Sequence, residues 1–150
     1  MKEKRFVCKQ ESDMLALGGR LASLLTPPAF VALHGGLGAG KTALVRGMGQ
    51  RLGADAVSSP TFTIVQEYDT QPKLLHFDAY RLADADELLA IGFTDYLCED
   101  AILVMEWAEL VESALPAQRL ELTIEDSGDQ ARTVRALARG RAYERLLEQL

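Results

Sequence analysis

Residues 35–42 read Gly-Gly-Leu-Gly-Ala-Gly-Lys-Thr and fit the pattern G-x-x-x-x-G-K-[ST]. The apolar run 29–34 before them indicates a short buried strand, and a helical pattern begins at Thr42. A glycine-rich loop between a strand and a helix is the setting of a phosphate-binding P-loop. This order limits the chain to α/β folds in which the loop follows a strand of the central sheet. It predicts a nucleoside triphosphate with Mg²⁺ as the ligand.

The chemistry of phosphate binding accounts for the positions in this loop. Glycines at 35, 38 and 40 allow backbone angles and a close approach that a side chain would block, so N–H groups can converge on phosphate oxygens. Lys41 would reach the β- and γ-phosphates as a mobile charge, and the Thr42 hydroxyl would bind the metal. The alternative is an ordinary glycine turn followed by a solvated lysine. The residues expected to contact the nucleotide here are Gly38, Ala39, Gly40, Lys41, Thr42 and Ala43.

The 150 residues are 48% hydrophobic and 25% charged, which suits one compact α/β domain over residues 1–150. No apolar run approaches the ~20 residues of a membrane span, and no signal-like segment follows the N-terminus, so we expect a soluble cytoplasmic protein. Cys8 and Cys98 are far apart in sequence and are expected to be buried and reduced. The formal net charge of −6 argues against a broad nucleic-acid surface, so any RNA role would run through a partner.

Apolar periodicity and turn signals predict a three-layer, P-loop NTPase-like α/β fold with a mixed parallel and antiparallel central sheet. Residues 5–9 should form a short strand, and Ser12 should cap a helix that runs to Leu25 before two prolines. The uninterrupted apolar run 101–105 predicts a central strand that is covered on both faces. The other expected elements are strands at 61–68 and 73–80 joined as a hairpin, a strand pair near 119–124 and 133–138, and helices at 83–91 and from Arg141.

Two acidic residues stand where a P-loop enzyme needs a metal-binding carboxylate, at the end of a strand next to the loop. Glu106 follows the apolar run 102–105, and Asp78 ends the run 74–77. We expect Glu106 to bind magnesium and Asp78 to act on a metal-bound or attacking water, with Lys41 as the third catalytic residue. The alternative for each acid is a solvated carboxylate at a strand end.

Several further polar residues surround these acids in the sequence. In a strand, His76, Asp78 and Tyr80 would share one face beside the phosphates, or else form a satisfied polar strand edge. The segment 58–63 suits a loop that orders around a γ-phosphate, or an ordinary strand entry. Trp107 is the only tryptophan, and it would cover the nucleotide site or a partner surface, or pack in the core.

Taken together, these motifs resemble the bacterial TsaE family. The matching segments are residues 35–42, Ser-Pro-Thr-Phe-Thr at 59–63, His-Phe-Asp-Ala-Tyr-Arg at 76–81 and Glu-Trp-Ala-Glu at 106–109. They occur in the family's order and spacing over nearly the whole chain. The resemblance implies a small Mg²⁺-dependent ATPase of the tRNA threonylcarbamoyladenosine pathway. It also implies partners of the TsaB and TsaD types, which carry out the modification and are reset by ATP hydrolysis.

The family pattern also implies roles for individual residues. It places Lys41 on phosphate, Thr42 and Glu106 on magnesium, and Asp78 as an acid needed for hydrolysis. It puts Trp107 near the nucleotide site.

The family pattern is less well matched at Glu11, Arg132 and Gly36. Glu11 resembles the family's adenine-side contact, and Arg132 would approach the nucleotide. Many relatives carry Asp where this chain has Gly36, so the loop has one negative charge fewer beside the phosphates.

The sequence also allows three functions other than an ATPase with partners to be compared with its motifs: a GTPase, a small-molecule kinase and a nucleotide-gated binding module. A GTPase would need an N-K-x-D-like motif and a D-x-x-G switch, and neither occurs in the sequence. A small-molecule kinase would usually need an arginine-bearing lid, which is missing as a long insertion, although Arg46 and Arg81 leave this alternative open. A nucleotide-gated binding module would differ mainly in whether turnover matters. Since no arginine finger or water-orienting glutamine is evident, the isolated chain should hydrolyse ATP slowly.

Overall fold

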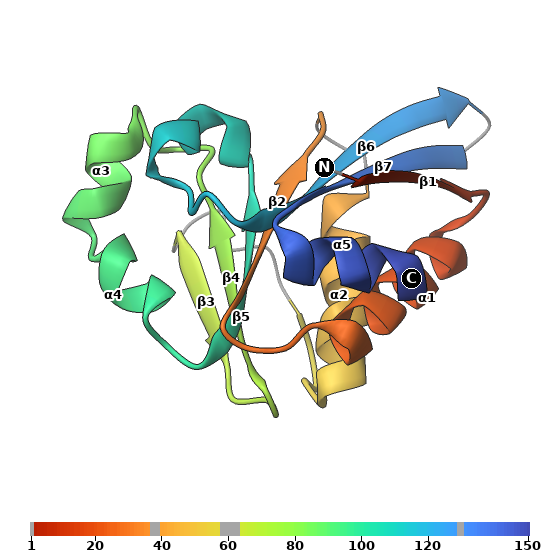
Figure 1. Cartoon of the computed structure of the whole chain (residues 1–150), viewed down its shortest axis with the longest axis horizontal. Helices are drawn as coiled ribbons and strands as arrows, with labels where there is room; N and C mark the ends of the chain where they lie inside the picture. Colours follow the sequence, from red (N-terminus) through yellow and green to blue (C-terminus); the bar gives the residue numbers. More distant parts are fainter. Residues whose placement is uncertain (1, 37–39, 58–63, 129–130) are drawn as a thin grey trace.

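The computed structural model describes the whole chain except residues 1, 37–39, 58–63 and 129–130. In the described part, seven strands form one mixed sheet in the order β1-β7-β6-β2-β5-β4-β3 (Figure 1). Their bounds are β1 Lys2–Cys8, β2 Ala29–His34, β3 Val65–Tyr68, β4 Lys73–Asp78, β5 Ala101–Glu106, β6 Arg119–Gly128 and β7 Ala131–Arg139.

The centre of the sheet is parallel and its edges are antiparallel. Strand β2 pairs in parallel with β5 on one side and with β6 on the other, and β5 pairs in parallel with β4. The hairpins β3–β4 and β6–β7 and the pair β1–β7 are antiparallel. Because β2, β4 and β5 point the same way, their carboxyl ends meet at one edge of the sheet. In open α/β sheets this is the edge where ligands bind.

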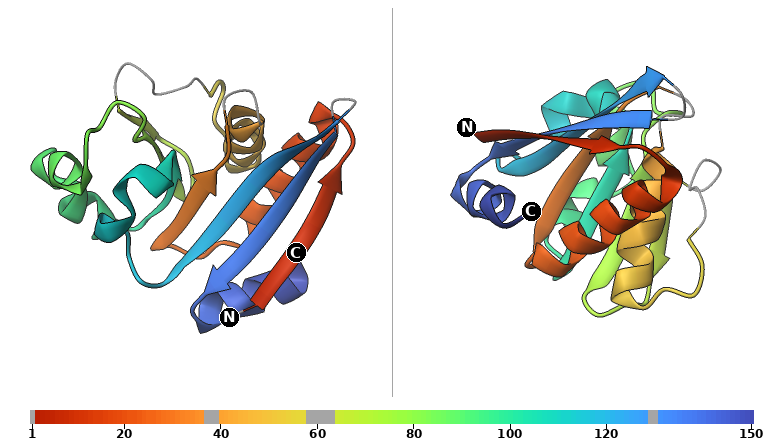
Figure 2. Two further views of the ribbon diagram at one scale, coloured as in Figure 1. Left: turned by 90° about the horizontal axis from the view of Figure 1, so that it is seen from above. Right: turned by 90° about the vertical axis from the view of Figure 1, so that its right-hand side faces the viewer.

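Helices cover both faces of the sheet and complete three layers (Figures 1 and 2). One face packs against α1 (Glu11–Leu24), α2 (Lys41–Leu52) and α5 (Arg141–Gln149), with a core that includes Leu21, Leu44 and Leu147. The other face packs against α3 (Ala85–Ala90), α4 (Phe93–Leu97) and the 3-10 helix η1 (Ala108–Ala114). Alternate residues of β2 and β5 are buried on each face, which is why both strands are continuous apolar runs.

Helices α1 and α2 lie side by side (Figure 2). They approach each other closely because each presents a glycine to the other. A Cβ added to Gly18 would lie 2.1 Å from the Leu44 carbonyl oxygen, and one added to Gly47 would lie 2.1 Å from the Leu15 carbonyl oxygen. The contact brings Met14 of α1 against Gly40, the residue that caps α2. Any side chain at these two glycines would therefore push apart the first two helices and disturb the start of α2.

The structure corrects the predicted start of the first helix. Helix α1 begins at Glu11 rather than after a Ser12 cap, because the Asp13 carboxylate accepts hydrogen bonds from the backbone N–H groups of Lys9 and Gln10. The acceptor therefore comes from inside the first turn of the helix.

Other differences concern element ends and short helices. Strand β4 ends at Asp78, so Tyr80 lies beyond it and is 51% exposed. The helix predicted at 83–91 is shorter and starts after Asp84, which caps it by accepting from the Glu87 N–H. Helices α4 and η1 were not predicted. Both cysteines are free, but only Cys8 is buried, so the expectation of a buried Cys98 was wrong.

The two hairpins, the two central strands and the last helix agree with the sequence predictions. Strand β1 runs from Lys2 to Cys8 rather than over 5–9, and β3 begins at Val65 rather than at 61, with residues 61–63 outside the described part of the chain. Within the part of the chain that the structure describes, no helix is long and apolar enough to cross a membrane.

Candidate functional site

Strand ends and the start of α2 bring the candidate site residues together. His34, Asp78 and Glu106 are the last residues of β2, β4 and β5, and Asp78 is the register partner of Glu106. Helix α2 begins with Lys41 beside the same edge. The backbone turns into this helix through Gly35 and Gly40, whose φ angles of 149° and 102° favour glycine. The sheet edge thus collects groups that lie far apart in the sequence.

The Lys41 side chain is held in place and is only 5% exposed. Its Nζ donates a 2.7 Å hydrogen bond to the Gly35 carbonyl and lies 3.7 Å from the centroid of the Trp107 ring. Burial lowers the pKa of Lys41, while the carboxylates of Glu106, Glu109 and Asp78 act in the opposite direction. The mobile charge expected from the sequence is, in this structure, a desolvated ammonium group among three acids.

Trp107 covers this lysine in an unusual backbone conformation. Its φ of 58° and ψ of 33° lie in the left-handed region, which is rare for a bulky residue and is often found at functional sites. The exposed Tyr80 packs on its indole ring, with the two ring centroids 5.0 Å apart. Trp107 thus lies beside Lys41 and also packs, partly buried, against the core cluster that contains Phe93. Its role at a nucleotide stays a prediction.

The two acids predicted for the site are nearly buried and lie on the face of the sheet that packs against α2. Asp78 is 6% exposed and accepts a 2.9 Å hydrogen bond from the Tyr80 N–H. Glu106 is 5% exposed, and its Oε2 lies 2.6 Å from His76 Nε2. The shared face predicted for His76 and Asp78 is therefore present, but Tyr80 does not extend it.

The donor set suits a magnesium ion that is shared with phosphate groups. Two neighbouring carboxylates and the Thr42 hydroxyl at the start of α2 are hard oxygen ligands of the kind Mg²⁺ prefers. Among the described residues no group of three or more His, Cys, Asp or Glu side chains could hold a metal alone. Mg²⁺ is commonly bound by one or two carboxylates together with substrate phosphates.

Glu11 and Arg132 lie at the same carboxyl edge of the sheet, but beyond β6, on the side of β2 away from β5 and β4, where β1 leads into α1. Arg132 of β7 is the register partner of Cys8, and its Nη1 lies 3.3 Å from Asp126. Glu11 is the first residue of α1 and pairs with Arg46 of α2 at 2.7 Å. Through α1 and Met14, this region adjoins Gly40. The roles of Glu11 and Arg132 at the nucleotide stay predictions.

Two of the predicted contacts, Gly38 and Ala39, lie outside the described residues, as does the segment 58–63. Ala43 is buried in the first turn of α2, next to Thr42.

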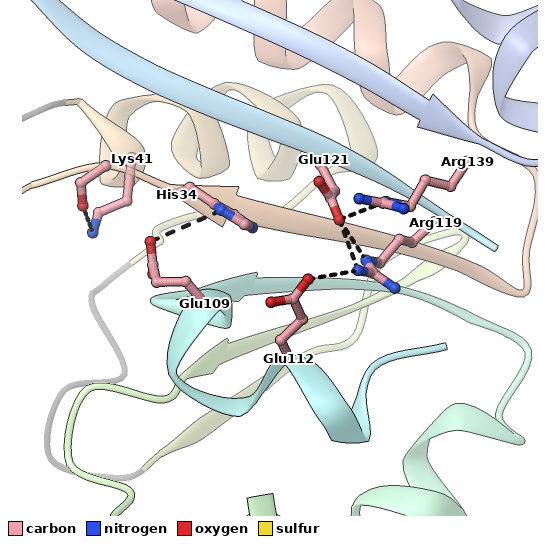
Figure 3. A network of polar contacts seen from close by, with 8 residues as sticks. His34, Lys41, Glu109, Glu112, Arg119, Glu121 and Arg139 are labelled. Atoms are coloured by element: carbon pink, nitrogen blue, oxygen red, sulfur yellow. Dashed lines mark hydrogen bonds and ion pairs between the residues drawn. The ribbon is translucent and has the colours of Figure 1, made fainter. Parts of the chain in front are cut away.

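Polar residues that the sequence analysis did not assign also lie beside Lys41 (Figure 3). His34 Nδ1 is 3.9 Å from a carboxylate oxygen of Glu109, a residue of η1. Farther along the face of the sheet that packs against η1, Glu121 forms ion pairs with Arg119 and Arg139, each at 2.8 Å. Burial alone would raise the pKa of Glu121, but the two arginines hold it below its usual value. The position of His34 directly before the glycine loop was the only sequence signal for its place at the site.

Comparison with known proteins decides the family. Residues 8–134 match the family model described as threonylcarbamoyl adenosine biosynthesis protein TsaE. This chain belongs to the TsaE family. The resemblance inferred from the four motifs is thereby confirmed.

Individual TsaE relatives match over most of their length. The tRNA threonylcarbamoyladenosine biosynthesis protein TsaE of Bacillus subtilis (strain 168) is 37% identical over 152 residues, which cover 100% of this chain and 95% of the relative. The protein of the same name from Haemophilus influenzae is 43% identical over 135 residues, 85% of each chain. The crystal structure of Bacillus subtilus YdiB superposes on this chain with a TM-score of 0.87 at 32% sequence identity. The match covers 99% of this chain and 93% of the YdiB chain. The P-loop NTPase-like fold is confirmed.

Proposed function

We propose that the chain is an ATP hydrolase of tRNA threonylcarbamoyladenosine biosynthesis, and that its turnover resets a complex of TsaB-type and TsaD-type proteins. The observation that carries the proposal is the convergence of Lys41, Asp78 and Glu106 at the carboxyl edge of the sheet, directly after a glycine loop. Membership of the TsaE family supports the pathway and the partners. The modification of the adenosine beside the anticodon is left to those partners, and tRNA would be reached through them.

Each residue has a chemical role in this proposal. Lys41 neutralises charge on the β- and γ-phosphates, and Thr42 and Glu106 hold Mg²⁺, with further contacts from the loop, Trp107, Glu11 and Arg132. Bound Mg²⁺ neutralises charge on the phosphate oxygens. Asp78 orients and deprotonates the attacking water, directly or through the metal shell.

Slow hydrolysis by the isolated chain is part of the proposal. Arg46, the arginine closest in sequence to Lys41, has its guanidinium paired with Glu11 at 2.7 Å. An arginine that stabilises the transition state commonly accelerates such reactions by about 10³–10⁵-fold. A partner complex would supply this stimulation.

The test is steady-state ATP hydrolysis by the purified chain, alone and with a TsaB–TsaD-type complex, with GTP as the control nucleotide. We expect slow ATP-selective turnover that the complex strongly stimulates. Fast turnover without any response would point to an independent enzyme, and binding without stimulated turnover would point to a nucleotide-gated binding module.

Two variants test the assigned roles. Lys41→Ala should abolish nucleotide binding or hydrolysis, while Arg51→Ala, at the opposite end of α2, serves as the matched loss of a cation. Asp78→Ala should lower kcat by roughly 100-fold or more while the ATP Kd changes little, because a general base acts in the chemical step. The exposed Asp55→Ala is its control. Normal turnover in either site variant would refute the assigned role.

A further inference from the structure

Among the residues that the structure describes, His76 is the one fully buried polar side chain at the site that the proposed function does not use. It is 0% exposed, and its Nε2 lies 2.6 Å from Glu106 Oε2. Its other ring nitrogen, Nδ1, is buried and has no hydrogen-bond partner among the described residues. The hydrogen-bonding capacity of this imidazole is therefore directed at Glu106.

The sheet fixes this contact. His76 of β4 is the register partner of Val104 of β5, and Glu106 lies two residues further along β5 on the same face. The neighbouring residues on this face, Leu74 and Ile102, belong to the apolar core. Burial of an imidazole among apolar groups costs free energy unless a hydrogen bond compensates for it. If packing were the only requirement, an aliphatic side chain would fill this position at lower cost. The presence of a histidine therefore indicates a role beyond packing.

We propose that His76 is a positioning residue that fixes the Glu106 carboxylate for magnesium by donating a hydrogen bond from Nε2 to Oε2. The proposal rests on the assignment of Glu106 to the metal. With Oε2 held by the imidazole, the second oxygen, Oε1, is left for the metal or for a water bound to it. Residues that orient metal ligands in this way typically change metal affinity by about 10–100-fold when they are replaced.

A competing interaction shows why the carboxylate needs such support. Lys41 lies close enough to Glu106 for the two opposite charges to attract each other. A Glu106 side chain released from His76 can turn toward that ammonium group, which withdraws both the metal ligand and the phosphate-binding cation. The hydrogen bond from His76 keeps Glu106 available for the metal and Lys41 available for phosphate.

The test compares ATP affinity in EDTA with ATP affinity at increasing Mg²⁺, measured by calorimetry on the full chain. His76→Phe keeps the ring but removes the donor, and should weaken the Mg²⁺-dependent gain in affinity by about 10–100-fold. Its affinity for metal-free ATP should stay within about twofold of native, since no phosphate contact is removed. His76→Gln places an amide N–H near the position of Nε2 and should restore most of the gain.

A matched control separates positioning from packing. Phe77→Leu alters the next residue of β4, which is equally buried but faces Phe93 and Tyr96 on the opposite side of the sheet. It should lower stability without changing either affinity. If His76→Phe does not fold, His76→Asn replaces it, because the shorter amide lies near the position of Nδ1 and does not reach Glu106.

Two results would overturn the proposal in distinguishable ways. The positioning role alone would be overturned if His76→Phe or His76→Asn kept the full Mg²⁺-dependent gain in ATP affinity. It would also be overturned if His76→Gln and Phe77→Leu lost this gain equally. A native chain whose ATP affinity ignores Mg²⁺ would overturn the magnesium site of the proposed function, and the role of His76 with it.

Discussion

Replacement of Gly18 by alanine should force apart the two helices that support the glycine loop. The new Cβ would lie 2.1 Å from the Leu44 carbonyl oxygen and 3.1 Å from the Met48 nitrogen. Both are backbone atoms of α2, so no side-chain rotation can relieve the overlap. Helices α1 and α2 would have to separate by about 0.9 Å before the shorter distance reached 3.0 Å.

The expected loss of stability follows from this separation. A gap of about 0.5–1 Å removes roughly a quarter to a half of the dispersion energy between atoms that were in contact. The buried side chains around this crossing include Leu17, Leu21, Leu44 and Met48. Overpacking of this kind costs up to about 3 kcal/mol, and alanine returns about 1 kcal/mol through its higher helix propensity. The net loss should be about 2 kcal/mol, which corresponds to a fall in Tm of roughly 4–8 °C.

Gly19→Ala is the matched control, one residue along the same helix. Its Cβ would lie 3.7 Å from the Gly47 carbonyl oxygen and 3.9 Å from the Arg51 Cβ, both ordinary contacts. It should therefore stabilise the protein by about 0.5–1 kcal/mol. The free energy of unfolding of both variants is measured by urea denaturation. The reasoning is wrong if Gly18→Ala is as stable as the native chain or as Gly19→Ala.

Two further predictions concern buried groups of the core. Tyr143→Phe should cost about 1–3 kcal/mol, because the Tyr143 hydroxyl accepts a 2.9 Å hydrogen bond from the buried Phe30 N–H, which would be left unpaired; an unchanged urea midpoint would contradict this. Burial, and to a smaller extent the Asp13 carboxylate, raises the pKa of the Cys8 thiol above its ordinary value of 9.0, while Arg20 lowers it. As pH rises, the thiol therefore loses its proton in the unfolded chain before it does so in the folded chain. The free energy of unfolding should fall as pH rises from 9.0, the ordinary pKa, through the higher pKa of the folded state. Cys8→Ala should flatten this alkaline decline relative to Cys98→Ala, and equal slopes would exclude the thiol as its source.

The sequence predicts the centre of this fold well because the central strands are covered on both faces. Strands buried on both sides must be apolar throughout, so β2 and β5 appear as uninterrupted runs that end at the polar His34 and Glu106. The same logic places Asp78 at a strand end. Since the carboxyl ends of parallel strands share an edge, the meeting of Asp78, Glu106 and the glycine loop could be expected before the structure was known.

Tertiary contacts explain what the sequence could not predict. The contact of Lys41 with Trp107 depends on a left-handed backbone conformation at the tryptophan, which local propensity disfavours. The bond between His76 and Glu106 follows from the register of β4 against β5, which no local pattern specifies. The short helices α4 and η1 are held by the aromatic and aliphatic core around Phe93 rather than by their own periodicity.

The pairing of β1 with β7 joins the two ends of the chain, since Lys2 lies opposite Ala138. Closure of so long a loop has a large entropic cost, and pairs of this kind generally form late in folding. Strand β1 can join the sheet only after β7 is in place. Until then the apolar side chains of β1, such as Phe6 and Cys8, have no sheet to join, and they stay exposed to other chains in the way that makes folding intermediates prone to aggregation. A weaker β1–β7 pair would therefore raise the tendency to aggregate during folding as well as lower the stability of the folded protein.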